Sequence, residues 1–258
     1  MAVLLALLFL MLQALVAVLV KDVFGSKGLM LLFGVTIPAL IIVFIAKSAN
    51  RTSFAETIHW DEVRKGKMFS IILMTITASV LASELENIIA DYVMSPEVYF
   101  KYLEDFTDFF VMDNMGDIML GMVSLTIFGP LMEEVLFRGV IFRAIAANRG
   151  SFMGIVVSSL LFMFVHLNPI QFPAALALGI LYSAMLSRGY SVSDTFLSHA
   201  LFNTFSAFFF FGIIEFPGMS LNRAGEVVHV PLSLIIGSLV FFVISLLIVF
   251  REESNTAS

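Results

Sequence analysis

Long, nearly uninterrupted apolar runs constrain the fold of this chain more than any other feature. Residues 3–20, 28–46 and 231–250 are apolar over lengths close to the roughly 20 residues that a helix needs to cross a bilayer. Only 13% of the residues are charged, against about 25% in an average soluble domain. The period-2 alternation of membrane barrels is absent. The sequence therefore predicts an all-α fold, a polytopic membrane helical bundle.

Eight candidate spans can be drawn, at 3–20, 28–46, 68–84, 117–147, 151–167, 172–187, 192–214 and 231–250. The fourth is long enough for a tilted span or for two helices broken at Gly129-Pro130. The first lacks the basic region of a signal peptide, so we interpret it as a span. With both termini cytoplasmic, the inner loops carry nine lysine and arginine residues and the outer loops carry four. Seven spans, which would move one terminus outside, are the alternative.

The remaining composition excludes several kinds of function. There are no cysteines, so disulfides, thiolate metal sites and cysteine nucleophiles are excluded. No basic patch with interleaved aromatic residues is present, so we expect no nucleic-acid partner. Between residues 84 and 117, nine acidic residues accompany one base, Lys101, and six aromatic residues between Tyr99 and Phe110 interleave with them. This segment predicts an amphipathic helix at the outer membrane interface, with a lid or substrate-docking element as the alternative.

Three charged residues interrupt the fourth span. Glu133, Glu134 and Arg138 each cost roughly 2.5–3.5 kcal/mol at membrane depth on insertion scales, so their presence indicates a use. Glu134 and Arg138 are four residues apart and can pair on one helix face. Glu133 is rotated by about 100° from Glu134, so the two carboxylates have different roles. We expect Arg138 to neutralise Glu134 while Glu133 faces a cavity, where it could act as a general base. Pro130 fits the first turn of a helix, because its missing N–H would be unpaired there.

Two later apolar segments each carry a histidine. Phe162 and His166 share a helix face, and Asn168-Pro169 then ends that helix. His199 and Asn203 are again four residues apart, and polar groups on one stripe of a membrane helix usually face the bundle interior. Taken alone, His166 favours a structural role. Taken alone, His199 and Asn203 fit a contact between helices as well as they fit a function. The other two histidines, His59 and His229, lie in predicted loops.

The three motifs together resemble a known family. Glu-Glu-x-x-x-Arg at 133–138, Phe-x-x-x-His at 162–166 and His-x-x-x-Asn at 199–203 occur in this order on consecutive apolar segments. The pattern is similar to the CAAX protease and bacteriocin-processing (CPBP, or Abi) family of intramembrane endopeptidases. The resemblance covers residues 117–214 and implies a catalytic helical core there. Residues 1–116 then form N-terminal spans with the acidic-aromatic segment, and residues 215–258 form the last span and a short cytoplasmic tail.

The resemblance also implies a role for each motif residue. Glu133 would activate a water molecule, and His166 would help to position it. His199 and Asn203 would stabilise the oxyanion, while Glu134, Arg138 and Phe162 would support the geometry. Glu133, His166 and His199 could also form an open zinc site, and a mechanism without metal fits the same residues.

The expected function is therefore hydrolysis of a peptide bond in a membrane-associated, in some cases prenylated, peptide or protein. The expected partners are that substrate and the lipid bilayer, and the sequence does not determine the oligomeric state. A proton-coupled transporter would use the same acids and histidines as a relay. A non-catalytic immunity or scaffold protein would use them only to join helices.

Overall fold

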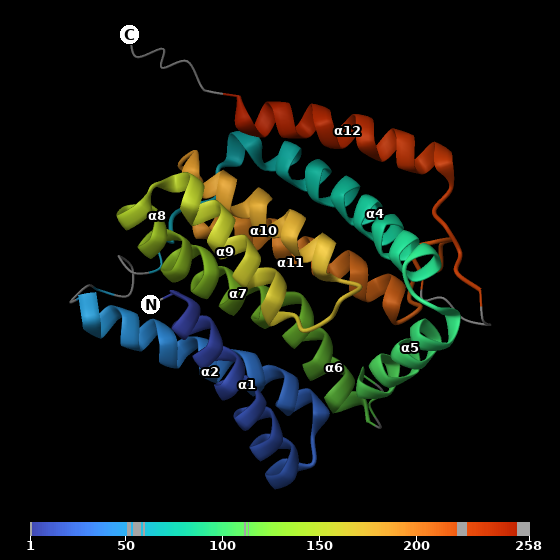
Figure 1. Cartoon of the computed structure of the whole chain (residues 1–258), viewed down its shortest axis with the longest axis horizontal. Helices are drawn as coiled ribbons and strands as arrows, with labels where there is room; N and C mark the ends of the chain where they lie inside the picture. Colours follow the sequence, from blue (N-terminus) through green and yellow to red (C-terminus); the bar gives the residue numbers. More distant parts are fainter. Residues whose placement is uncertain are drawn as a thin grey trace.

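The computed structural model describes residues 2–50, 53, 58, 60–110, 112, 114–220 and 226–251. His59 lies outside these residues. Helices make up the regular structure of the described part, without strands, which confirms the predicted all-α class (Figure 1). They are α1 (Ala2–Phe24), α2 (Lys27–Asn50), η1 (Lys65–Lys67), α4 (Met68–Tyr92), α5 (Pro96–Phe110), α6 (Met115–Val123), η2 (Ser124–Phe128), α7 (Gly129–Glu134), η3 (Val135–Phe142), α8 (Arg143–Arg149), α9 (Ser151–Val165), α10 (Phe172–Ser187), α11 (Val192–Phe210) and α12 (Leu232–Phe250).

Each of the eight predicted spans coincides with a helix or a helical run, but fewer of them are long and apolar enough to cross a membrane. Among the described residues, five meet both conditions: α1, α2, η1 with α4, the run from α6 to α8, and α12. The prediction of about eight spanning helices is too high by this measure. Helices α9 and α10 have 15 and 16 residues, and therefore rise only about 23 Å, less than the ~30 Å hydrocarbon core.

The helices form three layers (Figure 1). Helices α1 and α2 pack as a hairpin on one side, and α4 packs along α12 on the other. The run from α6 to α8, together with α9, α10 and α11, lies between these two layers. Helix α1 begins and α12 ends on the same side of the bundle in Figure 1.

The outer helices expose large apolar side chains, and the inner helices pack closely against one another. Large apolar residues such as Met11 on α1 (71% exposed) and Leu247 on α12 (67%) face outward, where a bilayer would cover them. The inner helices instead approach one another through small residues. A Cβ on Gly179 of α10 would stand 3.0 Å from Ser159 of α9, so glycine permits this close contact. The inner helices are only partly covered by their neighbours, because Phe152 (76% exposed) and Phe164 (53%) on α9 also face outward.

The acid-rich segment does not form a single interfacial helix. Helix α4 continues to Tyr92 and carries Glu84 and Asp91. His229, ahead of α12, donates from Nδ1 to Glu84 Oε1 at 2.9 Å, and its Nε2 lies 3.4 Å from Asp91. These contacts tie the segment before α12 to α4. Only α5 is amphipathic in the predicted way, because a charged stripe of it is exposed while its aromatic residues other than Phe109 are at least partly buried.

Candidate active site in the helical core

The acid pair lies on a helical run that contains two π-helical segments. Of the two possibilities for the fourth span, the structure has the continuous one, because η2, α7 and η3 follow one another from residue 124 to residue 142 without a break at Gly129-Pro130. Pro130 occupies the first turn of α7, as predicted. In η2, the Gly129 N–H bonds to the Ser124 carbonyl, five residues back, and Pro130 has no N–H to offer. The carbonyl of Leu125 is therefore left without a helical donor.

Asn203 of α11 uses that vacant carbonyl. Its Nδ2 donates to the Leu125 oxygen at 3.0 Å. A buried carbonyl without a donor costs about 1–3 kcal/mol, so the side chain stabilises the π-helical segment and fixes α11 against it. An asparagine amide has two N–H groups, and one of them remains for another acceptor.

Glu134 and Arg138 form a fully buried ion pair. Arg138 Nη1 lies 3.2 Å from Glu134 Oε1, and both side chains are 0% exposed. The i,i+4 pairing predicted from the sequence is therefore present. The Arg138 guanidinium also lies 4.2 Å from the ring centroid of Phe162 and 5.3 Å from that of Tyr182. The charge that Arg138 brings into the core is thus balanced by one carboxylate and two aromatic faces.

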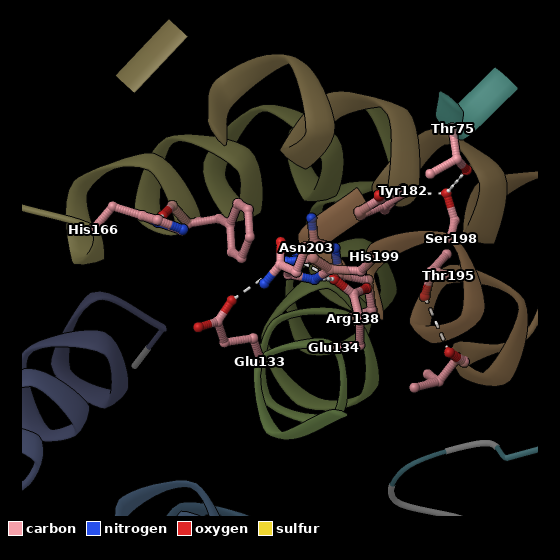
Figure 2. A network of polar contacts seen from close by, with 12 residues as sticks. Thr75, Glu133, Glu134, Arg138, His166, Tyr182, Thr195, Ser198, His199 and Asn203 are labelled. Carbon is pink, nitrogen blue, oxygen red and sulfur yellow. Dashed lines mark hydrogen bonds and ion pairs between the residues drawn. The ribbon is translucent and has the colours of Figure 1, made fainter. Parts of the chain in front are cut away.

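His199 lies between the two carboxylates. Its Nδ1 donates to Glu134 Oε1 at 2.9 Å, and its Nε2 is 3.7 Å from Glu133 Oε2 (Figure 2). The ring is held by Phe162 and Tyr182, each with its ring centroid 5.7 Å away. Glu133 is 20% exposed, whereas Glu134 is completely buried. Glu133 is therefore the carboxylate that remains accessible to a ligand or water.

His166 lies apart from this group. It caps the end of α9, and its Nδ1 donates to the Phe162 carbonyl at 2.7 Å. Figure 2 shows it away from the Glu133–His199 contact. The family resemblance implied that His166 would position the water activated by Glu133, whereas the histidine next to Glu133 in the structure is His199. The structure brings together Glu133, Glu134, Arg138, Phe162 and His199, with Asn203 one turn further along α11 and His166 on the facing element.

Tyr182 and Ser198 belong to the same polar group, and sequence reasoning missed both. Ser198 Oγ donates to Tyr182 Oη at 3.4 Å and lies 2.6 Å from Thr75 Oγ1 on α4 (Figure 2). Tyr182 is 0% exposed and covers both His199 and Arg138. One indication of this contact was present in the sequence, the tyrosine within the apolar segment 172–187. A buried tyrosine hydroxyl needs a hydrogen-bond partner, so a polar neighbour could have been expected.

The N-terminus of α11 is fixed by Asp194, which orients the helix that carries His199. Ser191 and Asp194 form a capping box, and Asp194 Oδ1 also accepts from the Arg64 backbone N–H at 2.8 Å. Asp194 is 0% exposed. The loop that precedes α4 is therefore joined to the helix of the candidate site.

The three residues that could have formed a zinc site, Glu133, His166 and His199, do not come together as metal ligands in the structure. Among the residues that the structure places, no group of three histidine or acidic side chains could hold a metal ion. Both nitrogens of His199 face carboxylates, and Nδ1 of His166 faces a carbonyl. Glu133, His166 and His199 therefore do not fit a zinc site as placed, and no catalytic step is assigned to a metal.

The central segment matches one protein family. Residues 116–205 match the model of the family described as "Type II CAAX prenyl endopeptidase Rce1-like". The Bacillus subtilis (strain 168) protein "Putative membrane peptidase YdiL" is 26% identical over 95 residues, which cover 37% of this chain and 39% of that protein. The match thus spans about two fifths of the relative. No solved structure matches the chain. These findings confirm the family resemblance that the three motifs predicted.

Proposed function

We propose that this chain is an intramembrane endopeptidase that hydrolyses a peptide bond in a membrane-associated peptide or protein. The observation that carries the proposal is the position of Glu133. It is a partly exposed carboxylate next to His199, whose other ring nitrogen contacts the buried Glu134–Arg138 pair. The family match over residues 116–205 supports a peptidase, and its description suggests prenylated tails as one substrate class.

Glu133 acts as the general base. It takes a proton from a water molecule, whose oxygen attacks the peptide carbonyl and generates an oxyanion. Glu133 Oε2 is 3.7 Å from His199 Nε2, so a small movement lets the proton pass to the ring. The ring then gives the proton to the leaving amine as the C–N bond breaks. Glu134 accepts from Nδ1 throughout, which fixes the ring and stabilises its charged form.

The oxyanion requires donors that are already in place. Once His199 carries a proton on Nε2, it can donate to that oxygen. Asn203 can contribute its second N–H, because the first is used by Leu125. His166 lies at the end of α9, on the element that faces the site, and its Nε2 is available because Nδ1 already donates to the Phe162 carbonyl. We assign it to the positioning of water or of the substrate carbonyl.

A cleavage assay in proteoliposomes tests the proposal. Wild type, Glu133→Ala and His166→Ala are compared on a panel of plain and lipidated peptides, with Glu62→Ala as a control at a highly exposed acid. Loss of the base should lower the rate by about 100-fold or more, and the control should equal wild type. Equal background hydrolysis by all four proteins, across the whole panel, would refute the proposal.

A further inference from the structure

Helix α5 contacts both elements that carry the site histidines. Phe106 of α5 lies edge-on to Phe210 at the end of α11, with ring centroids 5.5 Å apart. Tyr102 lies against the segment that follows His166, where its hydroxyl accepts from Asn168 Nδ2 at 2.6 Å. Figure 1 shows α5 lying across this end of the core. The helix thus joins the end of α9 to the end of α11.

Asn168 is held at several atoms. Its side-chain oxygen accepts from the Ile170 N–H at 3.2 Å, while its carbonyl accepts from Phe172 N at 3.1 Å and starts α10. Asn168 is only 6% exposed. Its Oδ1 bonds within the segment, and its Nδ2 points toward α5, where it donates to the Tyr102 hydroxyl. The Tyr102 hydroxyl is therefore the contact that connects this side chain to α5.

The backbone between His166 and Asn168 adopts a conformation that needs such support. Leu167 has φ of 50°, the single non-glycine residue with positive φ in the described part of the chain. Leucine rarely adopts this conformation, and it persists only where the surroundings enforce it. His166 immediately precedes Leu167, so the strained residue lies between the imidazole-bearing residue and Asn168.

We propose that Tyr102 is a positioning residue for His166, acting through Asn168. The inference rests on the proposed function, because it assigns α5 to the same catalytic site. Ring packing supports the placement: Tyr102 stacks on Phe106 with centroids 5.7 Å apart, and Tyr99 packs with Ile170 in one buried cluster. Burial raises the pKa of Tyr102 to about 12, so the hydroxyl stays neutral over the working pH range.

The test compares Tyr102→Phe, Asn168→Ala and Asn168→Asp with wild type. Tyr92→Phe is the matched control, because the substitution also removes a tyrosine hydroxyl but at a residue that is 76% exposed. We expect Tyr102→Phe and Asn168→Ala to lower kcat by on the order of 10-fold, with KM within about twofold, since misplaced groups act on the chemical step. Asn168→Asp should recover part of the rate, because the Tyr102 hydroxyl can donate to the carboxylate.

Hydrogen exchange at residues 166–168 is the second readout. It should become faster in Tyr102→Phe and in Asn168→Ala but not in Tyr92→Phe. Wild-type kcat in Tyr102→Phe, or unchanged exchange at these residues, would overturn the inference. If wild type cleaves no peptide, the proposed function fails, while the exchange measurement still decides whether Tyr102 holds the segment.

Discussion

Replacing Arg138 by methionine removes the charge that balances Glu134 and keeps an unbranched side chain in the same space. Both residues of the pair are completely buried, with Nη1 and Oε1 3.2 Å apart. Removing one partner of a buried pair leaves an uncompensated charge, which costs about 3–5 kcal/mol. The substitution also removes the contacts of the guanidinium with Phe162 and Tyr182, which lowers stability further. This loss is not simply additive with the loss from the ion pair, because both involve the same side chain.

Glu133→Gln provides the contrast, because Glu133 is 20% exposed and its contact with His199 is longer, at 3.7 Å. Such a partly solvated pair contributes about 0–1 kcal/mol. The two variants should therefore differ by at least roughly 2 kcal/mol. At about 2–4 °C per kcal/mol for a chain of this size, Arg138→Met should melt at least roughly 4–8 °C below Glu133→Gln.

Thermal unfolding of detergent-purified protein, followed by circular dichroism, measures this difference. Arg149→Met is the control for loss of an exposed arginine. The double variant Glu134→Gln/Arg138→Met should regain much of the lost stability, because it removes the stranded charge. Equal melting temperatures for Arg138→Met and Glu133→Gln, or a double variant no more stable than Arg138→Met, would refute this reasoning.

Three further predictions concern other parts of the fold. The hydrogen bond to Glu84 on α4 raises the pKa of His229. The charged imidazole therefore contributes its full stabilisation below the ordinary histidine pKa of 6.5. This stabilisation should be lost as the pH rises through the raised pKa, so the melting temperature of wild type should fall with pH more than that of His229→Gln. An equal fall in both proteins would contradict the prediction. Asp194→Ala should lower stability by about 1–2 kcal/mol through loss of the α11 cap, whereas Asp194→Asn should lose less in the same melting assay. Gly179→Val should cost about 1–3 kcal/mol by overpacking against α9, while Gly237→Ala, where a Cβ meets nothing within 4 Å, should not destabilise; equal losses would refute the close contact.

The sequence predicted the helices well because apolar runs and breakers report directly on them. It also predicted the Glu134–Arg138 pair, because i,i+4 spacing on a helix is a local property. It left open whether the helix continues through Pro130 or breaks there. That outcome depends on Asn203, 78 residues away from Leu125, which supplies the donor that the π-helical segment lacks. A local pattern contains no information about such a distant partner.

The site was predicted in composition but not in arrangement. The residues of the three motifs carry the chemistry, yet which histidine meets Glu133 depends on how α9 and α11 pack around η3. Tyr182 and Tyr102 were missed because each is a single polar aromatic residue, and their partners, Ser198 and Asn168, become neighbours only after folding.

The role of Glu133 is tested most directly by the rate of peptide hydrolysis in proteoliposomes of wild type and of Glu133→Gln. The substitution keeps the shape of the side chain and removes its ability to accept a proton. If Glu133 is the base, Glu133→Gln should be folded, with a melting temperature near that of wild type, and should cleave about 100-fold more slowly or worse. A folded Glu133→Gln protein that cleaves at the wild-type rate would contradict the proposed mechanism.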